Sequence, residues 1–289
     1  MISNRRADIA WSVTSDGRAC SSGAAQATRA RITKTLREGN FHIPALPQVA
    51  IELQQLASRP DADLAAAVKL AYRDPDLAAR VLAIASSPAF GARARIADLR
   101  QAAARIGLNG MRDAAMGLAM RRIFRAPGPL QERMEAESKR LYVLGCATLY
   151  LARTRGFDMM FGFLCGLFAD VGRPALLSLL ASWGRGQPEW LEHGRIDCAL
   201  EHLHNEVGAM ITAQWELPAA VVAAARDHHD IDPKREPTPL TCAVAVADAA
   251  IDAGDEIKQV LDAPGARCIG VTADHLGGLV DTILQAWSE

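Results

Sequence analysis

The chain has 289 residues and a formal net charge of −1 at pH 7; half of its residues are hydrophobic, but only 5% are aromatic. About 54 alanines fill the gap; because alanine and leucine favour helices, the composition predicts an all-α protein long enough to bury a core. No uninterrupted apolar run reaches the roughly 18 residues of a membrane span, and no apolar segment follows the charges of residues 1–6, so we expect neither a membrane protein nor a signal peptide. The six cysteines form no CxxC pair, which predicts reduced thiols in a cytoplasmic protein.

The near-zero net charge hides two oppositely charged parts. Up to Arg125 there are about 19 basic and 10 acidic residues, whereas the remainder has about 13 basic and 23 acidic residues. The sign changes at Arg-Ala-Pro-Gly-Pro, residues 125–129, whose helix breakers are typical of a linker. We therefore predict three parts, which are a poorly ordered tail over 1–24, an N-terminal helical lobe over 25–126, and a helical bundle with a C-terminal helix over 130–289.

The N-terminal lobe is predicted to consist of short helices. The first spans 25–38 and is closed by Gly39, after which prolines keep residues 41–47 extended. A sharper start follows at Asp74-Pro75-Asp76, where a capping side chain, a proline and an acidic first turn come in the order that helix N-termini favour. Other helices of this lobe are expected to begin near Val49, Leu64, Leu99 and Met111.

Longer helices are predicted beyond the linker, and no alternating pattern of useful length indicates a strand. One apolar segment among them, 159–168, is expected to be wholly buried. The predicted helices of this part span 131–154, 159–168, 174–183, 197–215, 219–229, 241–253 and 273–287.

Five polar side chains lie on or beside apolar helical faces of the second part. They are Asp170, His204, His228, His229 and Asp248. Because a buried carboxylate or imidazole must be paired, we expect these groups to converge. Histidines and carboxylates from different helices are the donors of divalent metal sites, which can polarise a phosphoryl oxygen and generate hydroxide. A buried hydrogen-bonded cluster without a metal fits the same pattern.

Short motifs recur in a fixed order over roughly residues 40–253, and together they resemble the HDOD family, a signalling relative of the HD-domain metal-dependent phosphohydrolases. The order and spacing of these motifs carry the resemblance. They are Ile43-Pro-Ala-Leu-Pro47, Asp74-Pro-Asp-Leu77, Ser86-Ser-Pro-Ala-Phe-Gly91, Gly166-Leu-Phe-Ala-Asp-Val-Gly172, His204-Asn-Glu-Val-Gly208, Trp215-Glu-Leu-Pro218, His228-His229 and Val246-Ala-Asp248.

The resemblance implies a two-lobed all-α fold, with an N-terminal helical lobe packed on an HD-like bundle. Asp170 matches the aspartate of the His-Asp doublet, but Ala169 stands at the position of its histidine. The first histidine ligand of the superfamily aligns near Tyr142 or Val143, where this chain has no histidine. The later ligand positions are matched by His204, His228, His229 and Asp248. The resemblance therefore implies a degenerate remnant of a metal site.

We accordingly expect a bacterial, cytoplasmic, non-catalytic signal-transduction module that binds a signalling protein or a small signalling ligand. No catalytic residue and no cofactor are predicted, although a weakly bound divalent metal stays an option. The alternative is a residual metal-dependent phosphohydrolase or phosphodiesterase acting on nucleotides through the surviving ligands. Nucleic acid is not expected as a partner, because no aromatic stacking platform accompanies Arg121, Arg122 and Arg125. A membrane partner is not expected either.

Overall fold

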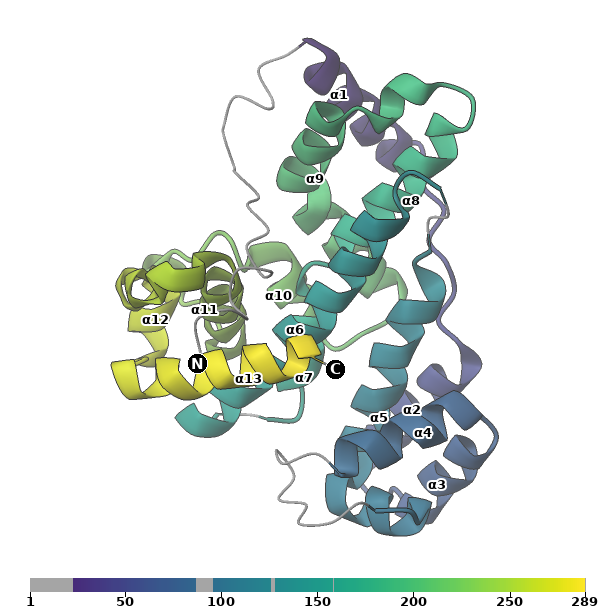
Figure 1. Ribbon diagram of the computed structural model, residues 1–289, viewed down its shortest axis with the longest axis vertical. Helices are drawn as coiled ribbons and strands as arrows, with labels where there is room; N and C mark the ends of the chain where they lie inside the picture. Colours follow the sequence, from purple (N-terminus) through teal and green to yellow (C-terminus); the bar gives the residue numbers. More distant parts are fainter. Residues whose placement is uncertain (1–22, 87–95, 126–127, 158, 289) are drawn as a thin grey trace. The chain divides into compact units, whose positions relative to one another are not determined.

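The computed structural model describes residues 23–86, 96–125, 128–157 and 159–288 (Figure 1). Within these ranges all regular elements are helices, thirteen of them α-helices, and no strand is present. The predicted all-α class is therefore confirmed. The described residues divide into two compact units, Pro44–Ile123 and a larger unit that joins residues up to Ile43 with Phe124–Glu289.

The smaller unit is built around aliphatic side chains that recur at helical spacing. Leu53, Leu77 and Val81 are fully buried in it. Its last helix carries a kink at Gly107, where a φ of 69° requires the left-handed conformation that glycine adopts readily. The sequence predicted two helices on either side of this glycine, and the structure has two helical segments that meet at its non-helical backbone. The helices of this unit are α2 (Gln48–Ala57), α3 (Leu64–Tyr72), α4 (Pro75–Ala85) and α5 (Leu99–Ile123).

The N-terminus of α4 confirms the predicted helix cap. The Asp74 carboxylate accepts a hydrogen bond from the Leu77 amide at 3.1 Å. Arg122, near the end of α5, donates to Asp74 at 2.6 and 2.9 Å and to Asp76 at 2.6 Å. This pairing neutralises one of the three arginines that cluster at the end of the basic part of the chain.

The larger unit contains the helices of the predicted bundle and also α1 (Gly23–Arg37). α1 packs on α9 (His193–Gln214) and buries Ala25 and Ile32 completely. The Arg31 guanidinium lies 4.5 Å from the Trp183 ring centroid and 4.6 Å from that of Trp190. The prediction grouped this helix with the N-terminal lobe over 25–126, whereas in the structure it belongs to the larger unit, where its apolar face packs on α9. Residues 1–22 of the predicted tail over 1–24 lie outside the described residues, and α1 begins at Gly23.

Five other helices of the larger unit, α8, α9, α10, α11 and α13, pack on α6 or α7. α13 runs across α6 (Figure 1), and α7 packs closely along α6. Four short elements, η2, η3, η4 and α12, were not predicted; η2 packs on α8, and both η4 and α12 pack on α11. The elements are α6 (Gln131–Arg155), α7 (Gly162–Ala169), α8 (Gly172–Gly184), η2 (Pro188–Leu191), α10 (Ala219–Asp227), η3 (Pro233–Arg235), α11 (Pro239–Ala253), η4 (Gly254–Asp262), α12 (Pro264–Ile269) and α13 (Ala273–Ser288).

The stretch Gly162–Gly184 is apolar and long enough, by length and composition alone, to cross a membrane. This result differs from the expectation that the chain has no membrane-spanning segment, which rested on the absence of a long uninterrupted apolar run. In the structure the stretch forms α7 and α8 with a turn at Asp170 and Val171 between them, and 83% of its most apolar window is buried inside the protein. These two helices are therefore part of the core of the larger unit.

The cysteines differ in part from the reduced state that the sequence predicts. Cys146, Cys165, Cys242 and Cys268 are free thiols, and burial raises the pKa of Cys242 to about 12. Cys198 is disulfide-bonded, however. This bond was not predicted, because the spacing of the cysteines indicates no pairing.

Candidate metal site

Two helix ends and one helix face bring four of the predicted site residues together. Asp170 follows the last residue of α7, His204 lies in α9, and His228 and His229 follow α10. The first three are 2%, 3% and 1% exposed, respectively, whereas the side chain of His229 is 49% exposed. One ligand atom from each residue lies within 4.8 Å of the others. The predicted convergence therefore holds for these four side chains.

The close approach of α8 to α9 depends on Gly172. A Cβ atom at this position would lie 2.0 Å from the carbonyl oxygen of His204, far inside van der Waals contact. Gly166 has the same role on α7, where a Cβ atom would lie 2.3 Å from the carbonyl oxygen of Leu144 on α6. These glycines let the backbones approach, and Asp170 lies between them in the chain.

Hydrogen bonds to the backbone orient two of the imidazole rings. Nδ1 of His204 lies 2.6 Å from the Leu200 carbonyl oxygen, and Nδ1 of His228 lies 2.9 Å from that of Ala224. Because a carbonyl only accepts, each Nδ1 carries a proton and donates it. Metal-binding histidines are commonly held in this way, with the other ring nitrogen turned to the ion. Here Nε2 of both rings lies 3.4 Å from Oδ1 of Asp170.

Two of the atoms that face one another are buried and unsatisfied. Among the described residues, neither Oδ1 of Asp170 nor Nε2 of His228 makes a hydrogen bond of good geometry, although the two atoms lie 3.4 Å apart and form an ion pair when His228 is protonated. An unsatisfied buried polar group costs roughly 1–3 kcal/mol, so a cation between them, either a proton or a metal ion, would lower the free energy of the site. A separation of 3.4 Å also matches the roughly 3.4 Å between two ligand atoms of a tetrahedral ion with bonds of about 2.1 Å.

His229 supplies the solvent-facing side of the cluster. Its Nε2 lies 3.0 Å from Nε2 of His204, and its Nδ1 lies 3.8 Å from Oδ2 of Asp248. Since half of this side chain is exposed, the cluster is reachable from solvent at this point. An ion held by the three buried donors would therefore have its fourth donor at the surface.

Burial and charge set the protonation of the cluster. Burial lowers the pKa of His204 to about 4 in spite of Asp170, so this imidazole is neutral at pH 7. Burial also opposes the charge of His228, but the Asp170 carboxylate raises the pKa of His228 above its usual value. Burial acts to raise the pKa of Asp170, whereas His228, His204 and Arg173 hold it well below the usual range. Asp170 is thus an ionised carboxylate, as a ligand must be.

A guanidinium that the sequence analysis did not identify lies against the same carboxylate. Arg140 on α6 donates from Nε to Oδ2 of Asp170 at 3.3 Å, from Nη2 to Asp248 at 2.5 Å, and from Nη1 to Asp252 at 2.7 Å. Its side chain is 16% exposed. Burial opposes its charge, but the carboxylates of Asp248, Asp170 and Asp252 raise its pKa well above the usual value, so it stays charged.

Asp248, which the resemblance placed among the metal ligands, is paired with Arg140 and lies outside the group of four donors. A signal for this network was present in the sequence. Asp248 and Asp252 are the only charged residues of the apolar helix α11, and their spacing of four puts them on one face. A second pair adjoins it, in which Arg173 donates to Glu137 at 2.8 and 3.0 Å.

The donor set fits one metal ion and does not fit two. Three imidazoles and one carboxylate suit a borderline divalent ion such as Zn²⁺. The positions that align with the missing early histidines hold apolar packing instead. Ala169 and Val143 are fully buried, and the Tyr142 ring contacts Phe163 edge to face with centroids 5.9 Å apart. From α6, Arg140 reaches the carboxylates on the acidic side of the cluster.

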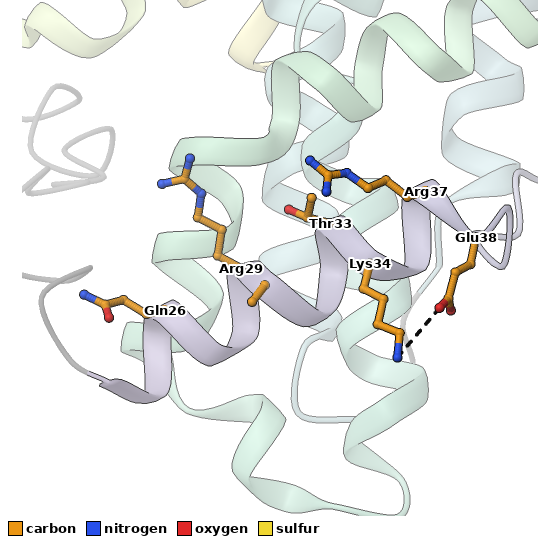
Figure 2. Close-up of a pocket in the computed structure, with 7 residues that line it drawn as sticks. Gln26, Arg29, Thr33, Lys34, Arg37 and Glu38 are labelled. Atoms are coloured by element: carbon orange, nitrogen blue, oxygen red, sulfur yellow. Dashed lines mark ion pairs between the residues drawn. The ribbon is translucent and has the colours of Figure 1, made fainter.

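A separate hollow lies along the outer side of α1 and shares no residue with the cluster. Figure 2 shows its polar side chains projecting from one helix, among them Arg29, Arg37 and Lys34. Lys34 pairs with Glu38 at 3.7 Å, which leaves the lining with an excess of positive charge. An exposed pair of this kind contributes only about 0.3–0.5 kcal/mol to stability.

The HDOD domain family matches residues 43–231 of the chain. A relative in the curated proteins, an uncharacterized protein of Treponema pallidum (strain Nichols), is 27% identical over 218 residues. The match covers 72% of this chain and 42% of the relative, so the chain spans less than half of that protein's length.

Solved structures share the fold. A proposed metal-dependent phosphohydrolase from Shewanella amazonensis SB2B has a TM-score of 0.73 at 19% identity, with 92% of this chain and 100% of that chain covered. An HDOD domain protein of unknown function from Geobacter sulfurreducens has a TM-score of 0.66 at 22% identity, with 90% and 96% covered. A proposed signal transduction protein from Marinobacter aquaeolei VT8 has a TM-score of 0.57 at 19% identity, with 98% and 69% covered.

Proposed function

The chain belongs to the HDOD domain family, and we propose that it is a non-catalytic module of bacterial signal transduction. In this role it binds a signalling protein or a small signalling ligand in the cytoplasm and catalyses no reaction. The proposal goes beyond the shared fold, because the solved relatives include both a proposed phosphohydrolase and a proposed signal transduction protein. The residues of the cluster favour a role in signal transduction over hydrolysis.

The observation that carries the proposal is the guanidinium of Arg140 among three carboxylates. Arg140 donates hydrogen bonds to Oδ2 of Asp170 and to Oδ1 of Asp248, so neither of these two oxygens is available to a metal ion on the Arg140 side of the cluster. Ala169 and Val143 supply no donor in place of the missing histidines. Loss of partners that only support metal ligands already lowers affinity about 10–100-fold, and loss of ligands themselves should lower it further. A hydrolytic centre with two ions is therefore not supported.

The unsatisfied atoms of Asp170 and His228 favour one alternative, a residual phosphohydrolase or phosphodiesterase acting on nucleotides. Asp170, His204, His228 and His229 would hold a single ion in that case. When bound, such an ion supplies a Lewis acid for a phosphoryl oxygen and lowers the pKa of water. The chain's own residues would fix the ligand rings through Leu200 and Ala224 and leave the side of His229 open to a substrate.

Hydrolysis assays with matched variants separate the two functions. The full chain is incubated with Mn²⁺ and a panel of nucleoside phosphates and cyclic or linear dinucleotides, beside the variants His204→Ala and His202→Ala. His202 is an exposed residue of the same helix and serves as the control. We expect the same background hydrolysis from all three proteins. Turnover in the wild type and in His202→Ala that disappears in His204→Ala would refute the non-catalytic role.

The network around α5 supports a partner other than nucleic acid. Arg122 donates three hydrogen bonds to Asp74 and Asp76, so its charge is already balanced within the smaller unit. Affinity for a phosphate backbone depends on basic side chains that can displace counterions. The remaining basic cluster is thus smaller than the sequence indicates, and we propose a protein or a small ligand as the partner.

A further inference from the structure

The two oxygens of Asp170 have different kinds of partner. Oδ1 lies 3.4 Å from Nε2 of both His204 and His228, whereas Oδ2 accepts from Nε of Arg140 at 3.3 Å. In centres with two metal ions about 3.5–4 Å apart, a shared carboxylate can give one oxygen to each ion. Here one oxygen faces an imidazole pair that could hold an ion, and the other already faces a fixed cation.

We propose that the guanidinium of Arg140 takes the place of a second metal ion, so that the cluster binds one divalent ion and excludes another. Three carboxylates surround this guanidinium, namely those of Asp170, Asp248 and Asp252, at distances from 2.5 to 3.3 Å. Oxygen-only surroundings of this kind are typical of hard divalent cations such as Mn²⁺. A covalently attached cation does not dissociate, so the second position stays filled.

The charges of the cluster agree with a capacity of one ion. When the carboxylates are ionised and the histidines are neutral, as metal ligands must be, the three carboxylates carry three negative charges against the one positive charge of Arg140, because Arg173 is engaged with Glu137. The excess of two negative charges equals the charge of one divalent ion. Arginine also differs from histidine in this place, since its guanidinium is always protonated and has no lone pair with which to bind a metal.

Metal stoichiometry tests the proposal without any substrate, and its outcome is therefore independent of whether the module is catalytic. The full chain is stripped with a chelator, dialysed against Mn²⁺ and analysed for bound metal by elemental analysis and electron paramagnetic resonance. The wild type is expected to bind one equivalent with the signal of an isolated ion. Arg140→Met is expected to bind two equivalents, because it frees the carboxylates of Asp170, Asp248 and Asp252 for a second ion, and to show the weakened signal of two coupled ions.

Arg133→Met is the matched control, because Arg133 also lies on α6 and pairs with a carboxylate, Asp197, outside the cluster. It should bind one equivalent, like the wild type. Arg140→Lys keeps the positive charge and is likewise expected to bind one. A folded Arg140→Met protein that binds no more metal than the wild type would overturn the proposal, as would a wild type that binds two ions or none.

Without metal, Arg140→Met leaves three carboxylates uncompensated, so its Tm should fall in chelator and rise more with Mn²⁺ than that of the wild type. Should this variant fail to fold, the double variant Arg140→Met with Asp252→Asn carries the test. It has one negative charge fewer, and Asp252 is the most exposed of the three carboxylates. Two bound equivalents support the proposal, and one bound equivalent overturns it.

Discussion

At the scale of single residues, the buried charges of the larger unit depend on one another. Asp170 is almost fully buried and faces two imidazoles and a guanidinium, and Arg140 holds Asp248 and Asp252 in addition. Removing one member of a buried ion pair typically costs about 3–5 kcal/mol, because the other charge stays behind without compensation. These side chains are therefore structural as well as candidate ligands, and a variant of one must be checked for folding.

A second charged residue, Asp74, predicts a pH dependence of stability. The hydrogen bonds from Arg122 lower the pKa of Asp74 below its usual value of 3.8, against the opposing effect of burial. The folded state thus favours the ionised carboxylate, so Asp74 stabilises the protein above pH 3.8, and this contribution is lost as the pH falls below that value.

Asp74→Asn keeps a capping oxygen but removes the charge. At pH 7 we expect the free energy of unfolding to fall by about 1 kcal/mol, since the pair is partly exposed and partly screened. At pH 3 the difference from the wild type should shrink, and urea unfolding at both values measures it. Asp98→Asn is the control, because Asp98 also accepts a hydrogen bond at a helix start, from the Gln101 amide at 2.8 Å. An equal loss at both pH values would contradict the role of ionised Asp74.

At the scale of elements, glycines decide how closely the helices around the cluster pack. Gly172→Ala would place a methyl group 2.0 Å from the His204 carbonyl oxygen, and a backbone atom cannot move aside as a side-chain end can. We expect a loss of at least about 1–3 kcal/mol, the usual range for overpacking. Chemical unfolding of the variant, followed by circular dichroism, measures this loss.

Gly277 on α13 provides the comparison for this variant. A Cβ atom at Gly277 would meet nothing within 4 Å, so Gly277→Ala should stabilise the protein by about 0.5–1 kcal/mol through the lower flexibility of alanine in the unfolded chain. The two substitutions are chemically identical and should have opposite signs. Similar unfolding free energies for both variants would show that α8 and α9 are not in the close contact described.

At the scale of the whole molecule, all four donors of the cluster belong to one unit. Asp170, His204, His228 and His229 lie in the larger unit, and none of them lies in Pro44–Ile123. A ligand that binds only the folded state stabilises it by about 2.7 kcal/mol at 100 times its dissociation constant. The stabilisation by a bound ion should therefore appear in the larger unit and not in Pro44–Ile123.

Hydrogen exchange with and without Mn²⁺ checks this expectation. Amides of α7, α9 and α10 should exchange more slowly with the ion, while those of Pro44–Ile123 stay unchanged. In His204→Ala the slower exchange should be lost, because one of the buried donors is absent. Protection that is confined to Pro44–Ile123, or that persists in His204→Ala, would place the ion elsewhere.

Local interactions explain how much of the fold was predictable. The helix cap at Asp74 is set by neighbours in sequence, and the excess of alanine indicates helices wherever glycine and proline do not interrupt them. Asp170, His204, His228 and His229 were identifiable because polar groups on apolar faces must find partners. The short elements η4 and α12 were missed, because their conformation depends on packing against α11.

The sequence by itself determined the helical class, most helix positions and the polar residues that had to be buried together. Only the tertiary structure decided which of them meet. Arg140 contacts Asp248 and Asp252 across 108 and 112 residues of chain, and α1 joins the larger unit through its contact with α9. The physical reason is the distance along the chain over which each interaction acts. Helical periodicity is set by residues a few positions apart, whereas the choice of a distant partner depends on how closely glycines such as Gly172 let whole helices approach.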